Sequence, residues 1–284
     1  MFLKRYFRVK VQLYLLLYVL DSNLISSTEY YVNWPEDKNQ AFPSRTSPIE
    51  IFSSEAKYVK TDRPLTFLAD YNEKNILINT GKTASVHLKY SSESHITGGI
   101  LYRDIYIYKK CRFFWNNDIQ GDTRLRIDGE GTPLEVQMVF YNNKYNNFTE
   151  ALNNADGLVV LSFLIDIGPE ENLDFNDFEN HMKKIKTTGS KVDIISGSVF
   201  GWFDEYFERS HYFAYPGDYE GCGCATSIVC VTRHNRPYIS EKQFRVFQNL
   251  KNVDGEPLEN LEQPHARHGR PLIYANTTQE ILLF

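Results

Sequence analysis

Hydrophobic and polar residues alternate along much of the chain, the pattern of β-strands with one buried face. The segments 85–90 (SVHLKY) and 134–141 (LEVQMVFY) alternate, and 104–115 (DIYIYKKCRFFW) is rich in aromatic and β-branched residues. The segment 157–168 (GLVVLSFLIDIG) is almost continuously apolar, as expected of a strand buried on both faces, and 227–233 (SIVCVTR) is a further predicted strand. Strands are therefore predicted to dominate the fold.

Helical spacing is confined to two segments. One helix is predicted to start near Asp174, and a second to start with the capping box Ser240–Gln243. Their predicted core residues are Phe175, Phe178, Met182 and Ile185 in the first and Phe244, Phe247 and Leu250 in the second. The aromatic stretch 200–213 is expected to pack against the sheet as loops and short helical turns. The pattern predicts an α/β, β-dominated fold with a large central sheet and a few peripheral helices.

The length of 284 residues with 42% hydrophobic content is enough for one sizeable core, and no Pro/Gly/Ser-rich linker divides the chain. The N-terminus differs from the rest, because a basic segment (MFLKRYFRVK) is followed by about ten mostly apolar residues. That apolar run is shorter than the ~20 residues of a membrane-spanning helix. We predict a signal peptide at 1–27 and one domain at 28–284, with an uncleaved anchor as the alternative.

Charge and sequons fit a secreted protein. Removing residues 1–27 takes away four positive charges and one negative charge, which moves the formal charge from −5 to about −8. An acidic chain without a basic block is a poor nucleic-acid or heparin binder, so that class is excluded. Asn147 and Asn276 begin glycosylation sequons. We expect a secreted glycoprotein with no stable membrane span after signal cleavage.

The four cysteines, Cys111, Cys222, Cys224 and Cys230, leave three disulfide connectivities open. Cys222 and Cys224 are too close together for a comfortable bridge within an extended segment, so one bridge from their turn to a distant partner is expected. Cys111 and Cys230 lie in predicted strands, where buried free thiols are the alternative.

The order of several motifs resembles the α-class carbonic anhydrases over roughly residues 32–275. These motifs are SPIEI (47–51), NTGK (79–82), ITGGIL (96–101), RFFWNN (112–117), LEVQMVFY (134–141), DGLVVLSFLIDIG (156–168), YPG (215–217) and RPLIY (270–274). The resemblance implies a single domain around a ten-stranded, mostly antiparallel twisted sheet with a conical cavity at its centre.

Active members of that family hold zinc with three histidines, two at i and i+2 on one strand and the third on the neighbouring strand. Alignment on Trp115 places Arg112, Phe114 and Gln137 at these positions. Arginine is a cationic donor that effectively never deprotonates, and phenylalanine has no lone pair. The resemblance therefore carries an expectation of no zinc and no cofactor.

The supporting positions differ as well. The carboxylate that orients the family's third ligand is retained as Glu135, whereas Arg124 and Glu220 stand at the positions of the gatekeeping carboxylate and threonine. Lys82 stands at the position of the proton-shuttle histidine, and an exposed lysine titrates near ~10. We expect Arg112 to occupy the former metal region and to pair with Glu135 or Glu220, with Gln137 completing the hydrogen bonds. Loss of Arg112 should then destabilise the fold by several kcal/mol; exposure of Arg112 to solvent is the alternative.

The histidines outside these positions are expected to be solvated or structural. His265 and His268, His211 and His87 fall in this group. The spacing of His265 and His268 could serve a metal on a helix, but the resemblance implies an extended C-terminal segment there, which favours a solvated pair.

From these residues we expect a secreted carbonic anhydrase-related protein that is not an enzyme and acts as a binding module for an extracellular protein. Two alternatives stay open. One is a zinc-dependent carbonic anhydrase with rearranged ligands such as His211, Cys222 and Cys224; the other is small-anion binding through Arg112, Lys82 and Arg124.

Overall fold

The computed structural model describes residues 46–209, 211–220, 225–230, 236–261 and 263–277. The predicted signal peptide at 1–27 and the cysteines Cys222 and Cys224 lie outside these residues. Contacts group residues 32–284 into one unit, to which every described residue belongs. The described strands are β1 Glu50–Ile51, β2 Lys57–Lys60, β3 Leu65–Leu68, β4 Lys74–Asn79, β5 Ala84–Leu88, β6 His95–Gly98, β7 Tyr106–Trp115, β8 Arg126–Ile127, β9 Leu134–Asn142, β10 Leu158–Gly168, β11 Lys191–Ile195, β12 Glu208–Arg209, β13 His211–Gly217, β14 Ala225–Cys230, β15 Tyr238–Ser240 and β16 Ile273–Asn276.

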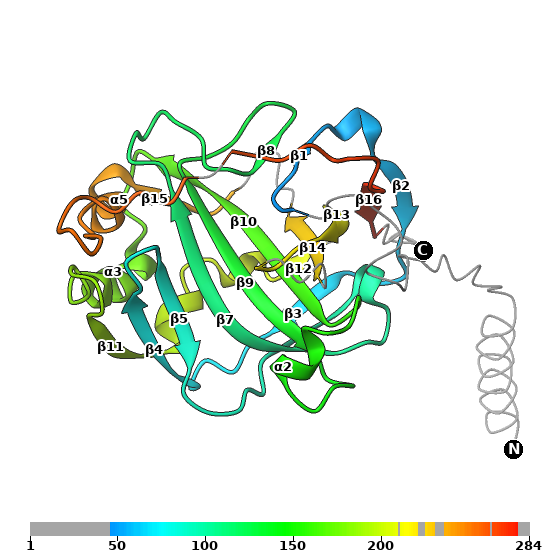
Figure 1. The fold of residues 1–284 in the computed structure, drawn as a ribbon, viewed down its shortest axis with the longest axis horizontal. Helices are drawn as coiled ribbons and strands as arrows, with labels where there is room; N and C mark the ends of the chain where they lie inside the picture. The colour runs from blue at the N-terminus through cyan, green and yellow to red at the C-terminus, as the bar shows by residue number, and fades with distance from the viewer. Residues whose placement is uncertain (1–45, 210, 221–224, 231–235, 262, 278–284) are drawn as a thin grey trace, which may run out of the picture. The chain divides into compact units, whose positions relative to one another are not determined.

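One large twisted sheet organises the unit (Figure 1). Ten strands follow one another in the order β11-β4-β5-β7-β9-β10-β14-β13-β16-β2, and β3, β6, β12 and β15 join beside this path. The pairs are antiparallel except for β10–β14, β10–β15 and β16–β2, while β1 and β8 form a separate parallel pair. The predicted β-dominated fold with a mostly antiparallel sheet is confirmed.

The long central strands form where the hydrophobic pattern places them. The segments predicted at 85–90, 104–115, 134–141, 157–168 and 227–233 correspond to β5, β7, β9, β10 and β14. Residues 158–165 of β10 are all buried, as the continuous apolar run predicts, because β9 and β14 flank the strand and side chains cover both faces. These strands carry most of the site described below.

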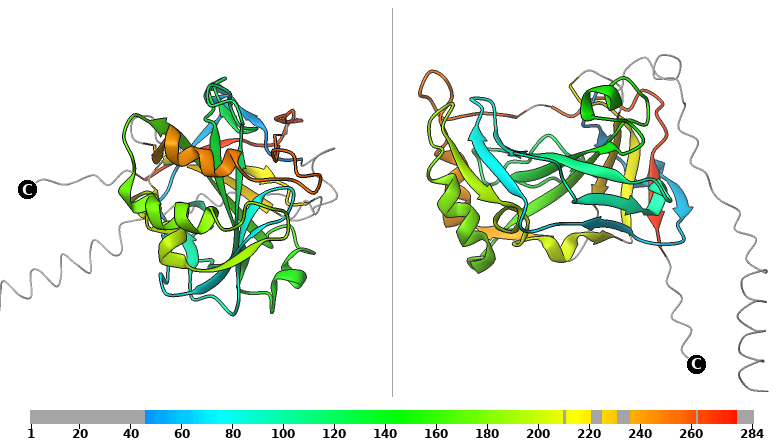
Figure 2. Two further views of the ribbon diagram at one scale, coloured as in Figure 1. Left: turned by 90° about the vertical axis from the view of Figure 1, so that its left-hand side faces the viewer. Right: turned by 90° about the horizontal axis from the view of Figure 1, so that it is seen from below.

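The helices are short and lie at the periphery of the sheet (Figure 2). They are α2 Phe148–Ala151, α3 Asn176–Met182, α4 Ser196–Phe200 and α5 Glu241–Gln248, with 3₁₀ turns η1 Ser53–Glu55, η2 Gly99–Leu101, η3 Leu173–Phe175 and η4 Asp204–Tyr206. The predicted capping box is present, since the Ser240 side chain accepts from Gln243 N while the Gln243 side chain accepts from Ser240 N. All seven predicted core residues of the α3 and α5 regions are buried.

The main hydrophobic core lies on the face of the sheet that receives Phe113, Trp115, Val136 and Phe163. The aromatic stretch 200–213 packs against this core, as predicted: Trp202, Phe203, Tyr206, Phe207 and Tyr212 are buried. The fourteen per cent aromatic content is therefore mainly a property of the core. No helix in the described part of the chain is long and apolar enough to cross a membrane.

Candidate functional site

Two neighbouring strands, β7 and β9, bring the three predicted ligand positions together. In their antiparallel register Arg112 lies opposite Gln137, and Phe114 lies opposite Glu135. Successive side chains of a strand point to opposite faces, so Arg112 and Phe114 point away from the core that contains Phe113. The period-two pattern of β7 therefore gathers these side chains on one face of the sheet.

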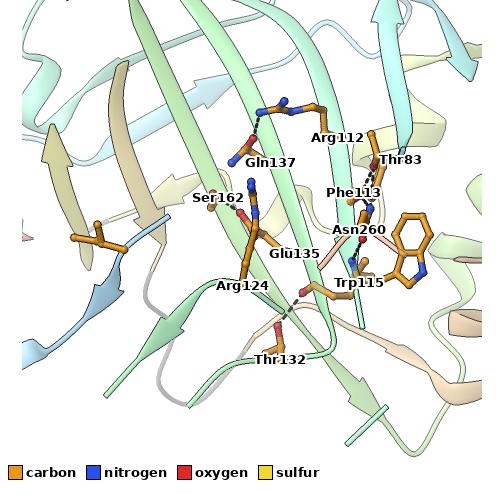
Figure 3. A network of polar contacts seen from close by, with 12 residues as sticks. Thr83, Arg112, Phe113, Trp115, Arg124, Thr132, Glu135, Gln137, Ser162 and Asn260 are labelled. Atoms are coloured by element: carbon orange, nitrogen blue, oxygen red, sulfur yellow. Dashed lines mark hydrogen bonds and ion pairs between the residues drawn. The ribbon is translucent and has the colours of Figure 1, made fainter. Parts of the chain in front are cut away.

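The guanidinium of Arg112 lies at the centre of this group (Figure 3). Its Nη2 donates a hydrogen bond to Gln137 Oε1, and its Nη1 lies 3.3 Å from Glu220 Oε1. Only 17% of the side chain is exposed, and Arg112 Nε is buried with no hydrogen-bond partner among the described residues. The expected pairing with Glu220 and Gln137 is present, and the alternative of a solvated Arg112 is wrong.

Glu135 has a different partner from the one considered in the sequence. Its Oε2 lies 3.4 Å from Arg124 Nε, and its Oε1 accepts a hydrogen bond of 2.9 Å from Ser162 Oγ. The two charged side chains are only 8% and 1% exposed, so this is a buried ion pair. Arg124 reaches Glu135 from the segment before β8, while Arg112 is directed to Gln137 (Figure 3).

Aromatic rings lie beside the guanidinium groups of Arg112 and Arg124. The guanidinium carbon of Arg124 lies 3.7 Å from the Phe114 ring centroid, and that of Arg112 lies 5.5 Å from the same ring. Tyr219 lies on the other side, with its ring centroid 4.8 Å from the Arg112 guanidinium. Each ring face attracts a cation, which adds to the ion pairs that Arg112 makes with Glu220 and Arg124 makes with Glu135.

Lys110 adds a further positive charge to this face of the sheet. Its Nζ lies 3.4 Å from the same Glu220 oxygen that Arg112 contacts, and 5.0 Å from the Tyr219 ring centroid. We call Lys110, Arg112, Gln137, Tyr219 and Glu220 the arginine site. Two cations thus converge on one carboxylate that is 59% exposed.

The pKa values around the arginine site reflect burial and positive charge. Burial lowers the pKa of Arg112 and of Lys110. Partial desolvation and then the charges of Lys110, Lys109 and Arg112 lower the pKa of His87. Desolvation works to raise the pKa of Glu220, but Tyr219, Lys110 and Arg112 outweigh it and hold that pKa below its usual range. The site therefore favours the anionic form of a carboxyl group.

The donor set of the arginine site does not fit a zinc ion. Arg112 offers only N–H donors and no lone pair for a metal, and neighbouring Phe114 has no lone pair either. Gln137 Oε1 already accepts a hydrogen bond from Arg112. Zinc requires deprotonated or neutral N, S or O ligands in a tetrahedral arrangement. No group of three or more His, Cys, Asp or Glu side chains that could hold a metal ion occurs in the part of the chain that the structure describes.

Lys82 lies apart from the arginine site. It is exposed in the turn between β4 and β5, where its backbone N donates to Thr80 Oγ1 at 3.3 Å. Lys82 makes no contact with Arg112 or Glu220 among the interactions of the described residues. The anion-binding alternative built on Arg112, Lys82 and Arg124 stays a prediction, and the structure adds Lys110, on the same strand as Arg112, to the cations near Glu220.

The predicted glycosylation positions differ in exposure. Asn147 is exposed and caps α2, with its Oδ1 accepting from Glu150 N at 2.9 Å. Asn276 is half-buried at the end of β16, where it pairs with His211 and Lys60 in neighbouring strands. Both remain predictions.

Among the described residues, no contact joins His211, His265 or His268 to the arginine site, and Cys111 is buried on the other side of the sheet, in the core. His265 and His268 are exposed, and His211 is exposed beside Tyr274. Cys111 is a free, buried thiol, as the alternative for it predicts. Cys230 ends β14, and the rest of the disulfide prediction lies outside the described residues.

Two residues of the site did not emerge from the sequence, namely Lys110 and Tyr219. The alternation along β7 that places Arg112 and Phe114 on one face also places Lys110 there, so the pattern held that information. Tyr219 directly precedes Glu220, yet only the path of the chain after β13 carries its ring to Arg112.

Comparisons with known proteins agree with this fold. The family model of the eukaryotic-type carbonic anhydrases matches residues 29–276. Human carbonic anhydrase 3 is 24% identical over 230 residues, covering 79% of this chain and 87% of that protein. Human carbonic anhydrase 7 is 26% identical over 232 residues, covering 80% and 86%, and mouse carbonic anhydrase 7 is 25% identical over 244 residues, covering 84% and 91%.

These comparisons correct one expectation. The prediction that the protein is not an enzyme is contradicted, because the relatives are named carbonic anhydrases, which are enzymes, and the family is catalytic. That prediction was drawn from three ligand positions, whereas the similarity extends over most of the chain.

Proposed function

Because the chain belongs to the eukaryotic-type carbonic anhydrase family, we propose that it uses the centre of the family's sheet as a binding site for a small oxyanion, with a guanidinium where the family holds zinc. Bicarbonate and short carboxylates are the ligands of this proposal. Zinc is not part of it, since the side chains at the three ligand positions lack the required donors.

One observation carries the proposal: Arg112 and Lys110 converge on a single carboxylate oxygen of Glu220. The Glu220 carboxylate marks where an anion lies between two cations, and a ligand of the same chemistry would replace it there. Planar guanidinium groups bind planar carboxylates and bicarbonate in a fork of two hydrogen bonds. Arg112 Nε, which is buried without a hydrogen-bond partner among the described residues, is a further donor of the same guanidinium.

Glu220 is the partner of these two ion pairs that water reaches. Its side chain is 59% exposed, whereas those of Arg112 and Lys110 are each 17% exposed, and the two ion pairs have lengths of 3.3 and 3.4 Å. An oxyanion that takes the place of Glu220 keeps the two largely buried cations paired when Glu220 moves into water. Arg112 in contrast is held by Gln137 and Tyr219, so the cation stays in place when Glu220 moves.

The experiment combines zinc analysis with anion binding on the purified protein. Elemental analysis after dialysis against a weak chelator is expected to find less than about a tenth of a zinc atom per chain. Titration with bicarbonate, followed by NMR shifts of the arginine side chains, is expected to saturate in the wild type and to be lost in Arg112→Gln. Glu220→Gln is expected to bind more tightly, because it removes the competing carboxylate.

The matched control is Arg103→Gln, since Arg103 is exposed and lies outside the arginine site. Equal binding by Arg112→Gln and Arg103→Gln would refute the oxyanion site. About one zinc atom per chain would refute the absence of zinc. A carbon dioxide hydration assay on the same samples then measures the activity of the family directly.

Secretion belongs to the same proposal. A basic segment followed by a short apolar one supports it, as does the exposed sequon at Asn147. Expression in a secreting host is expected to yield a protein in the medium that begins near residue 28. Its N-terminal sequence, determined by mass spectrometry, tests this.

A further inference from the structure

A groove between α3 and α5 gathers positive charge on a chain whose formal net charge is −5. Its charged lining consists of Lys183, Lys186, Lys242 and Arg245, with Glu179 as the one carboxylate. The two helices lie side by side at the end of the unit that Figure 2 (left) turns toward the viewer. We call this surface the basic groove.

The cations of the basic groove are available for a partner. Lys186 makes no ion pair within the described residues, and it is exposed. Lys183, Lys242 and Arg245 pair with Glu179, Glu171 and Glu241 at 2.7, 2.7 and 3.2 Å. The Lys242 and Arg245 pairs are solvent-exposed on both sides, and such pairs contribute roughly 0–1 kcal/mol. A carboxylate from outside can therefore replace Glu171 and Glu241 at small cost, whereas the partner of Lys183, Glu179, is only 14% exposed.

The floor of the groove is apolar. Met182, Val246 and Leu250 line it, but they belong to the core and are only 0%, 7% and 1% exposed. The aliphatic stems of the surrounding lysines therefore supply the apolar surface that a ligand can reach, while their charged ends stay in water. The groove has a volume of about 250 Å³. A cavity of roughly 150 Å³ holds one benzene-sized molecule, so the basic groove has room for one large apolar side chain with its neighbours.

We propose that the basic groove binds an acidic peptide segment of a partner protein, with an apolar side chain packed against the lysine stems and carboxylates at Lys186, Lys242 and Arg245. Charge complementarity selects the acidic partner, and the apolar stems favour a peptide over a sulfated polysaccharide, which has no apolar side chain to place against them. Asn249, exposed at the rim, adds an amide for the peptide backbone. This site shares no residue with the arginine site.

The test uses the full chain and a fluorescein-labelled peptide of about 12 residues in which glutamates surround two leucines spaced four apart. Fluorescence anisotropy is expected to show saturable binding that weakens with added salt, because salt screens exposed charges. The same peptide with glutamines in place of the glutamates is expected not to bind. Arg112→Gln is expected to bind the acidic peptide like the wild type, which separates this proposal from the oxyanion site.

The decisive variant reverses two charges of the groove, Lys186→Glu with Lys242→Glu, and is expected to weaken binding by about tenfold or more. The matched control reverses Lys57 and Lys60, two exposed lysines of β2 at the opposite end of the ten-strand path. Both pairs are exposed, so both double variants are expected to keep the wild-type melting temperature.

Three outcomes would overturn the proposal. One is equal weakening by the β2 control, and another is wild-type binding that does not saturate below about 1 mM peptide. The third is heparin binding at the groove more tightly than the peptide, which would make it a polysaccharide site.

Discussion

Arg124 rather than Arg112 is expected to carry the larger share of stability. Replacing Arg124 by alanine leaves Glu135, which is 1% exposed, with Ser162 as its remaining hydrogen-bond donor. Removing one partner of a buried ion pair costs about 3–5 kcal/mol, because an uncompensated charge remains in a low-dielectric site. The guanidinium also lies 3.7 Å from the Phe114 ring centroid, and that contact is lost with it.

The matched comparison is Arg112→Ala. The carboxylate that Arg112 contacts belongs to Glu220, which is 59% exposed and keeps Lys110 and water as partners when the arginine is removed. The main loss is then the hydrogen bond to Gln137, whose oxygen is left unpaired at a cost of about 1–3 kcal/mol. The sequence alone led us to expect the large effect at Arg112, and the structure moves it to Arg124.

Thermal unfolding followed by tryptophan fluorescence measures both variants. For a chain of this size, about 3–5 kcal/mol corresponds to a decrease in melting temperature of about 6–20 °C for Arg124→Ala. Combining Arg124→Met with Glu135→Leu removes both charges, so it is expected to recover at least half of that loss. A decrease for Arg124→Ala no larger than that for Arg112→Ala would refute the reasoning.

Two further predictions concern the surroundings of the site and the core. The pKa of His87 is expected below its ordinary value of 6.5 and is expected to rise in Arg112→Gln, because one nearby positive charge is removed. A histidine with a lowered pKa in the folded state stays neutral while the unfolded chain takes up a proton, so its contribution to stability is lost as the pH falls below about 6.5. An NMR pH titration of the wild type and of Arg112→Gln measures the His87 pKa in each. The same His87 pKa in the two proteins would contradict the prediction. Gly99→Ala is expected to cost about 2–4 kcal/mol, because φ is +53° and the added Cβ would overlap the Tyr212 hydroxyl that accepts from Ile100 N at 2.8 Å. Urea unfolding measures that cost, and a change below about 1 kcal/mol would count against it.

Local patterns predicted the strands and helices well, because each depends on neighbours in sequence. The alternation of β7 and β9 and the capping box of α5 are complete within their own segments. The same alternation predicted which side chains of β7 point away from the core. The family resemblance then supplied the arrangement of the strands, which no local pattern contains.

Pairings between side chains were predicted in part. Arg112 was expected to pair with Glu135 or Glu220; it pairs with Glu220, while Glu135 pairs with Arg124, which the sequence did not predict. Lys82 lies in the turn between β4 and β5, and its alignment with the proton-shuttle position stays a prediction. The basic groove brings Lys183 and Lys186 close to Lys242, which lies about sixty residues further along the chain. The negative net charge of the whole chain gave no indication of this positive surface.

The sequence by itself determined the strands and helices and the chemistry of the side chains that Arg112, Phe114 and Gln137 present together, since these depend on residue type and on the two-residue period of a strand. The tertiary structure decided which carboxylate each arginine meets and which surface collects the positive charges. Such pairings depend on distances of a few ångströms between segments far apart in the chain, and only the packing of the strands and helices sets those distances.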